Sequence, residues 1–137
     1  MQTSFTNKQL ENKDNKSSES ILRKCVHCGM CNATCPTYAI NGDELEGPRG
    51  RIYLIKDMLE NKKPANKKIA QHIDSCLSCY GCMTTCPSGV NYMHLIDHGR
   101  NHVEETYKRP LLDRLFRNIL SFTLPKPNVF LFLAFAT

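Results

Sequence analysis

Apolar residues recur at helical spacing in the middle of the chain. Between residues 48 and 61, Ile52, Ile55 and Leu59 fall on one stripe, and Pro48 stands where helices favour proline, at the first helical position. Polar residues occupy the positions between them. The pattern predicts an amphipathic helix of about four turns.

Three further segments carry the same periodicity. Asn66 can cap a short helix that follows it, and Asn91 can cap a longer one. Pro110 opens another apolar pattern over residues 111–120. No segment alternates convincingly between apolar and polar residues, so the predicted fold class is mainly α-helical.

The last residues differ from the rest of the chain. VFLFLAFA, at 129–136, is apolar throughout and far shorter than the roughly twenty residues that cross a bilayer. It has no basic polar face of the kind that an interfacial helix carries. We expect it to begin a buried helix, with a membrane-surface anchor as the alternative.

Two cysteine runs carry the chemistry. CVHCGMCNATCP at 25–36 and CLSCYGCMTTCP at 76–87 both read C-x2-C-x2-C-x3-C-P, and together they use all eight cysteines. In a reducing compartment such spacing favours metal ligation over disulfides. A four-ligand zinc site uses two C-x2-C pairs, which leaves the third and fourth cysteine of each run without a reason. Iron-sulfur ligation accounts for the whole pattern.

The spacing indicates two [4Fe-4S] clusters whose ligands cross between the runs. The first three cysteines of a run can surround one cluster, and the fourth, before proline, ligates the other cluster. The predicted ligand sets are Cys25, Cys28, Cys31 and Cys86 for one cluster, and Cys76, Cys79, Cys82 and Cys35 for the second. Pro36 and Pro87 restrict the backbone just after the crossing ligands.

Composition sets bounds on the class of protein. The chain has 137 residues, a common size for one domain, and a net charge of +5. Two clusters of about −2 each would leave roughly +1. Because no nucleic-acid motif accompanies this charge, nucleic acid is not an expected partner. Residues 1–17 are read as a polar arm without the apolar stretch of a secretory signal, which favours the cytoplasm.

Several histidines and lysines have weaker cases for function. His94, His98 and His102 fall at i, i+4 and i+8, a spacing that suits metal or haem ligands, but a solvated helix face is the preferred interpretation. His27 lies inside the first run and could donate to a cluster sulfur, with plain exposure equally favoured. The lysines of 62–68 are interpreted as a solvated loop, with docking to an acidic partner or anionic lipid second.

Two arginines, Arg49 and Arg51, flank Gly50 near the start of the first predicted helix. Backbone N–H groups at a helix start could bind an anion there. The preferred interpretation is an ordinary helix cap, with arginines that face a partner.

Longer stretches of the chain resemble a known family. GDELEGPRGRIYLIK lies between the cysteine runs, ILRKCVHCGMCNATCPTY contains the first run, and CPSGVNYMHLID begins at the end of the second. Over residues 18–127 the chain resembles the iron-sulfur subunit of bacterial glycolate oxidase, also called glycolate dehydrogenase. Related subunits serve lactate utilisation and anaerobic glycerol-3-phosphate dehydrogenase.

The resemblance implies a domain organisation. Residues 18–109 are expected to form an α-helical ferredoxin domain with two [4Fe-4S] clusters. Residues 110–137 are expected to be a helical extension that leads to a CCG region, which this sequence does not contain. The chain is therefore expected to be a piece of a longer protein.

The resemblance also implies a role in a multi-subunit oxidoreductase. A flavoprotein subunit would hold FAD and oxidise glycolate to glyoxylate, and this chain would pass the electrons towards the respiratory chain. Peripheral association with the cytoplasmic membrane is a further expectation. The alternatives are a free-standing two-cluster ferredoxin, a subunit that serves lactate or glycerol-3-phosphate, and a structural zinc module. No catalytic residue is predicted, because the sequence has no nucleophile–base or nucleotide-binding motif.

Overall fold

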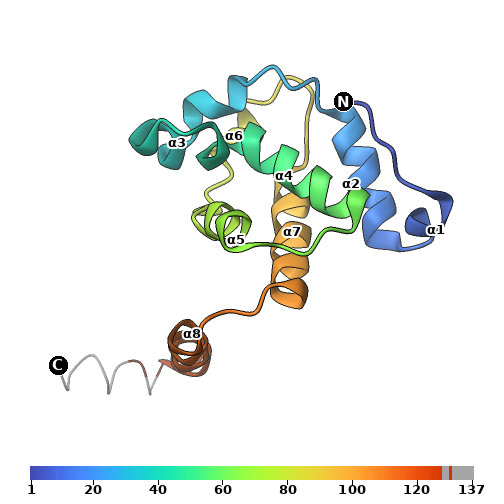
Figure 1. Ribbon diagram of the computed structural model, residues 1–137. Coiled ribbons are helices and arrows are strands. Elements are labelled where there is room, and N and C mark those ends of the chain that lie inside the picture. The colour runs from blue at the N-terminus through green and yellow to red at the C-terminus, as the bar shows by residue number, and fades with distance from the viewer. Residues whose placement is uncertain (128–129, 131–137) are drawn as a thin grey trace. The chain divides into compact units, whose positions relative to one another are not determined.

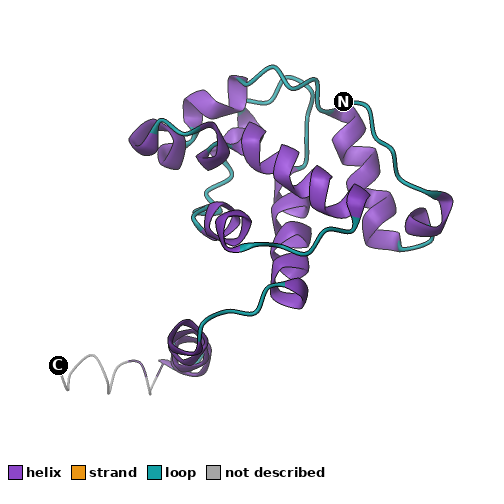
Figure 2. Ribbon diagram, in the orientation of Figure 1, coloured by secondary structure: helices purple, strands orange, loops and turns teal. Residues whose placement is uncertain are grey.

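The chain divides into two compact units, Met1–Tyr107 and Lys108–Thr137, of which the computed structural model describes residues 1–127 and 130. Every regular element within the described residues is a helix (Figure 2), so the prediction of a mainly α fold is confirmed. The elements in chain order are α1 (Asn7–Leu10), α2 (Lys13–Lys24), η1 (Met30–Thr34), α3 (Pro36–Asn41), η2 (Glu44–Glu46), α4 (Pro48–Asn61), α5 (Lys67–Asp74), α6 (Gly81–Thr84), α7 (Tyr92–Thr106) and α8 (Leu111–Thr123).

The core of the first unit lies where α4 packs on α7 (Figure 1). Ile55 of α4 and Leu95 and Ile96 of α7 are fully buried in it. Gly99 permits the close approach of the two helices, because a Cβ at this position would lie 2.8 Å from Ile55 Cγ1. Each large apolar side chain buried in this way contributes about 1.5–3 kcal/mol.

The helix starts follow the sequence signals. α4 begins at Pro48, as predicted. Asn66 Oδ1 accepts the backbone N–H of Ile69 at 2.9 Å, and Asn91 Oδ1 accepts that of His94 at 3.2 Å, so both predicted caps are confirmed. These caps set where α5 and α7 begin, and therefore where the second cysteine run lies between them.

The polar segment 1–17 is more than an arm, because α1 and the first part of α2 lie within it. Gln9 Nε2 donates to the backbone oxygen of Leu59 on α4 at 2.9 Å. Ser18 Oγ lies 2.7 Å from His98 Nδ1 on α7. These polar contacts hold α1 and α2 against the core, and the expected domain boundary at residue 18 falls inside α2.

The second unit contains α8, which has no buried residue. Its large apolar side chains are all exposed: Leu111, Leu112, Leu115, Phe116, Ile119, Leu120 and Phe122. Apart from Phe130, the apolar stretch 129–136 lies outside the described residues, so the buried helix expected there stays a prediction. In the described part of the chain, no helix has both the length and the apolar content needed to cross a membrane.

Candidate functional site

The two cysteine runs follow the same backbone path. The third and fifth positions of each run are left-handed: His27 at φ 59° and Gly29 at φ 85° in the first, and Ser78 at φ 52° and Tyr80 at φ 55° in the second. Gly29 takes this conformation without a Cβ penalty, whereas each of the other three residues costs roughly 1 kcal/mol or more. The repeated strain indicates that both loops are shaped to one purpose.

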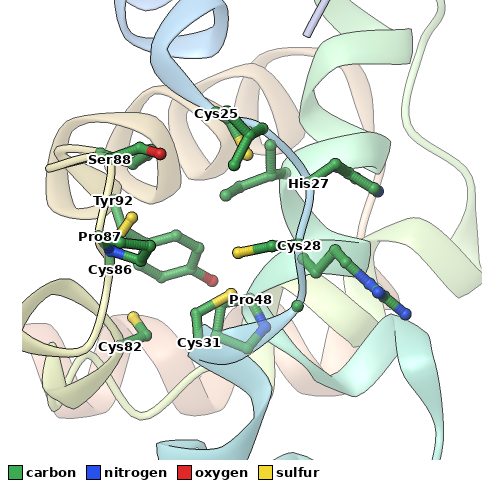
Figure 3. Close-up of a pocket in the computed structure, with 15 residues that line it drawn as sticks. Cys25, His27, Cys28, Cys31, Pro48, Cys82, Cys86, Pro87, Ser88 and Tyr92 are labelled. Carbon is green, nitrogen blue, oxygen red and sulfur yellow. The ribbon is translucent and has the colours of Figure 1, made fainter.

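The first pocket is lined by cysteines from both runs. Three cysteines of the first run and the last two of the second surround it (Figure 3): Cys25, Cys28, Cys31, Cys82 and Cys86. The remaining wall is largely apolar and includes Val26, Ile52, Pro87 and Val90. The structure therefore brings together the four residues that the sequence assigned to one cluster.

The second pocket contains the other predicted set. Its wall includes Cys76, Cys79, Cys82 and Cys35. Cys82 lines both pockets, as do Pro48 at the start of α4 and Tyr92 at the start of α7. The two pockets are thus neighbours, and the fourth cysteine of each run reaches the pocket that is built mainly by the other run.

The donor set suits a positively charged metal centre. All eight cysteines are free. Burial, reinforced by the charge of neighbouring thiolates, raises the pKa of Cys31 to about 11 and that of Cys82 to about 12. Thiolates in such positions need positive charge beside them, which the iron of a cluster would supply. Among the described residues, no three His, Cys, Asp or Glu side chains form a group that could hold a single metal ion.

Cys35 has more polar surroundings than the other thiols of the second pocket. Its Sγ lies 3.2 Å from Thr37 Oγ1 and 3.9 Å from Arg51 Nη1. Burial raises the pKa of the Cys35 thiol. The Thr37 hydroxyl, backbone N–H groups at the start of α3 and the Arg51 charge lower it by more, so the pKa lies below its ordinary value. The site at Cys35 therefore favours negative charge on sulfur.

Arg51 is buried, with 1 % of its surface exposed. Its Nη2 donates to Glu46 Oε2 at 2.8 Å and to Ser75 Oγ at 2.9 Å, and its Nε donates to the backbone oxygen of His72 at 2.7 Å. His72 Nδ1 in turn lies 2.6 Å from Glu46 Oε1. The interpretation of Arg51 as a charge that faces a partner or an external anion is therefore wrong.

Arg49 stays at the surface, at the edge of the first pocket. Its side chain is 33 % exposed and pairs with Glu44, which lowers the pKa of that carboxyl. Arg49 thus keeps the accessibility that a partner-facing charge requires, unlike Arg51 two residues further on.

Sequence reasoning missed Thr37, Glu46 and Tyr92 as parts of the site. The Tyr92 hydroxyl lies 3.7 Å from Cys76 Sγ, and burial raises the pKa of Tyr92, so the phenol stays protonated and can donate to this sulfur. Thr37 had one local signal, its place directly after Cys35-Pro36. Glu46 and Tyr92 had none, because their roles depend on contacts with residues distant in sequence.

The histidines contribute less to the pockets than the cysteines do. The His27 ring points away from the sulfur atoms in Figure 3 and lies 6.0 Å from the Tyr53 ring, so it is not placed to donate to a cluster sulfur. His27 is half-buried rather than plainly exposed. The rings of His94 and His98 are 6.2 Å apart on α7. Burial lowers the pKa of His98. The predicted solvated face is therefore only partly solvated.

An all-helical fold in which eight cysteines line two adjacent pockets defines a helical dicluster protein. The chain belongs to the 4Fe-4S dicluster domain family, whose family model matches residues 21–90. No solved structure matches the chain significantly.

Curated relatives extend the similarity beyond this domain. The chain is 53 % identical over 130 residues to the glycolate oxidase iron-sulfur subunit of Escherichia coli (strain K12), which covers 95 % of the chain and 32 % of that relative. It is 34 % identical over 119 residues to the probable glycolate oxidase iron-sulfur subunit of Bacillus subtilis (strain 168), with coverage of 85 % and 27 %. A succinate dehydrogenase iron-sulfur subunit of Paracoccus denitrificans is 29 % identical over 76 residues, with coverage of 51 % and 29 %. The chain thus spans about a third or less of the length of these relatives.

Proposed function

We propose that this chain is the electron-transfer module of a flavin-dependent glycolate oxidase and holds two [4Fe-4S] clusters. The observation that carries the proposal is the arrangement of the cysteines, since each pocket combines three cysteines of one run with the fourth cysteine of the other, and Cys82 lines both pockets. The two glycolate oxidase subunits to which the chain is similar support glycolate as the substrate of the complex.

The proposed ligands are the crossed sets. The first pocket would hold its cluster through Cys25, Cys28, Cys31 and Cys86, and the second through Cys76, Cys79, Cys82 and Cys35. Each cluster, when bound, accepts and releases one electron. The buried side chains of Ile52, Val90 and Tyr92 exclude water from the inner walls, where a lower local dielectric strengthens hydrogen bonds to sulfur.

Each run also presents an edge at which a redox partner can approach. Cys28 and Cys79 are exposed. Val26 and Leu77, the second residues of the two runs, are 67 % and 66 % exposed. An apolar side chain beside an exposed cysteine gives a partner a surface to bind within a short distance of the metal centre. We assign electron entry and exit to these two edges.

Substrate chemistry belongs to the partner in this proposal. Removing two electrons and a proton from the α-carbon of glycolate calls for a two-electron cofactor such as a flavin. The sequence contains no dinucleotide-binding or phosphate-binding glycine motif. The FAD is therefore assigned to a flavoprotein subunit, and this chain receives its electrons.

Anaerobic mixing followed by electron paramagnetic resonance tests this assignment. Glycolate should reduce the clusters of the reconstituted chain only when the flavoprotein subunit is also present. Of Val26→Glu and Leu77→Glu, the one at the entry edge should slow this reduction, whereas the other and the matched surface change Asn7→Glu on α1 should not. Reduction only by lactate or glycerol-3-phosphate systems would move the chain to those oxidoreductases. Stable clusters with no reduction by any flavoprotein would favour a free-standing ferredoxin.

We further propose that α8 supports peripheral membrane association. Leu112, Phe116 and Ile119 recur on one side of this helix, and Arg114 and Arg117 recur on the other, an arrangement that suits an interface with anionic lipid. Vesicles with anionic lipid should bind the chain, and Phe116→Asp should weaken binding more than Ser121→Asp. Equal binding by both variants would contradict the role of this face.

A further inference from the structure

The two crossing cysteines have the same sequence context but different surroundings. Cys35 is followed by Pro36 and Thr37, and Cys86 by Pro87 and Ser88. Thr37 Oγ1 lies 3.2 Å from Cys35 Sγ. Within the described residues, no side chain donates a hydrogen bond to Cys86 Sγ, and the wall beside it is largely apolar. The hydroxyl after Cys-Pro thus lies beside the crossing sulfur in one run only, where it donates its proton to the backbone oxygen of Glu46 at 2.7 Å.

A fixed positive charge adds to this difference. Arg51 Nη1 lies 3.9 Å from Cys35 Sγ, and the same guanidinium donates to Thr37 Oγ1 from both Nη atoms at 3.1 Å. Glu46 and Ser75 hold Nη2 at 2.8 and 2.9 Å. Because Arg51 is only 1 % exposed, neither solvent nor salt screens its charge effectively.

The Glu46 carboxylate does not cancel this effect at the sulfur. It contacts Nη2, Ser75 and His72, whereas Nη1 is the guanidinium atom that faces Cys35. The combined field of the network therefore stabilises negative charge at Cys35.

We propose that Arg51 and Thr37 raise the reduction potential of the centre held in the second pocket above that of the centre held in the first. This inference rests on the proposed function, in which each pocket holds one [4Fe-4S] centre. Reduction adds one negative charge, and a cation that donates to a ligand sulfur stabilises the reduced form more than the oxidised form. Thr37 Oγ1 accepts from both Nη atoms of Arg51 and so holds this cation beside Cys35 Sγ. Arg51 and Thr37 are positioning residues in this account.

The inference gives electron flow within the chain a direction. One electron lost by a centre held in the first pocket would be gained by a centre held in the second, with no proton transferred and no bond broken. In this direction of flow, the reduced flavoprotein is the electron donor and docks at the edge formed by Cys28 and Val26. The acceptor docks at the edge formed by Cys79 and Leu77.

The test is a redox titration of the reconstituted chain, followed by electron paramagnetic resonance. The two signals are first assigned with Cys86→Ser and Cys35→Ser. The second-pocket signal should then have the higher midpoint potential. Thr37→Val keeps the side-chain shape but removes the hydroxyl. It should lower that midpoint potential and leave the midpoint potential of the first-pocket signal unchanged.

Matched variants separate this electrostatic role from a structural one. Ser88→Ala, at the equivalent position of the second run, should leave both midpoints unchanged. Arg51→Lys should retain most of the wild-type potential, and Arg51→Met combined with Glu46→Gln should lower it further than Thr37→Val does. A second-pocket midpoint that is equal to or below that of the first pocket, or unmoved by Thr37→Val, would overturn the inference. Iron and sulfide analysis of the same samples tests the proposed function separately, because absent clusters would leave no signals to titrate.

Discussion

The two cysteine runs have one spacing but two kinds of support. Both place left-handed residues at their third and fifth positions, and both send their fourth cysteine to the pocket of the other run. The fourth cysteine of the first run, Cys35, meets a buried arginine and a threonine hydroxyl. The fourth cysteine of the second, Cys86, lines a pocket with largely apolar walls. The repeat therefore sets the ligand geometry, whereas residues outside the repeat set the electrostatics of each pocket.

The largest expected effect comes from removing iron, which acts on both runs at once. The clusters would tie together segments about fifty residues apart, so their binding energy becomes folding energy. Chelation under anaerobic conditions should reduce helical circular dichroism and lower the thermal midpoint of the domain. An apo-protein with both unchanged would show that the helical core alone fixes the two runs.

The next effect separates the two arginines. Arg51→Met leaves the Glu46 carboxylate buried without its partner and should cost about 3–5 kcal/mol of unfolding free energy. Arg49→Met, two residues away on the same helix, removes only an exposed pair and should change stability little. Urea unfolding of the two variants measures the difference. Equal losses would mean that the buried network does not distinguish the second pocket.

A smaller effect compares two glycines with positive φ. Gly29→Ala in the first run places a Cβ 2.7 Å from Arg49 Nη1 at φ 85°. Gly89→Ala, just after the second run, meets nothing within 4 Å at φ 59°. Both should lose roughly 1 kcal/mol from left-handed strain, and Gly29→Ala should lose more because the guanidinium must move. Thermal unfolding of both variants checks the order, and a greater loss for Gly89→Ala would contradict it.

The smallest effect concerns the second run alone. Arg100 donates from Nη1 to Ser78 Oγ at 2.7 Å and from Nη2 to the backbone oxygen of Cys76 at 2.6 Å. Arg100→Gln should therefore cost about 1 kcal/mol of stability and broaden the second-pocket signal. Asn101→Gln, next to it on α7 and exposed, is the control. A change in the first-pocket signal instead would contradict the assignment of Arg100 to the second pocket.

Local signals explain why much of the fold could be predicted from the sequence. Pro48, Asn66 and Asn91 act on their own helix starts, so their residue types suffice. The convergence of the two cysteine runs on neighbouring pockets could also be predicted, because loop spacing limits which sulfurs can share a pocket, whereas the ligand set of each cluster stays a prediction. These features depend on neighbours within a few residues or on the repeat itself.

The missed features depend on partners far along the chain. α2 is polar, and its Ser18 meets His98 eighty residues away. Arg51 looks like any helix-start arginine until Ser75 and the backbone of His72 close over it. Burial of a charge is decided by tertiary packing, and sequence periodicity carries no record of it. The electrostatic difference between the pockets was therefore beyond sequence reasoning.

The central claim is that each pocket takes its fourth ligand from the other run, and Cys86→Ser tests it most directly. The variant is reconstituted anaerobically beside Cys35→Ser, and the two clusters are followed by electron paramagnetic resonance. Cys86→Ser should perturb the cluster held by Cys25, Cys28 and Cys31 and leave the other intact. Damage confined to the cluster held by Cys76, Cys79 and Cys82 would contradict the crossed arrangement.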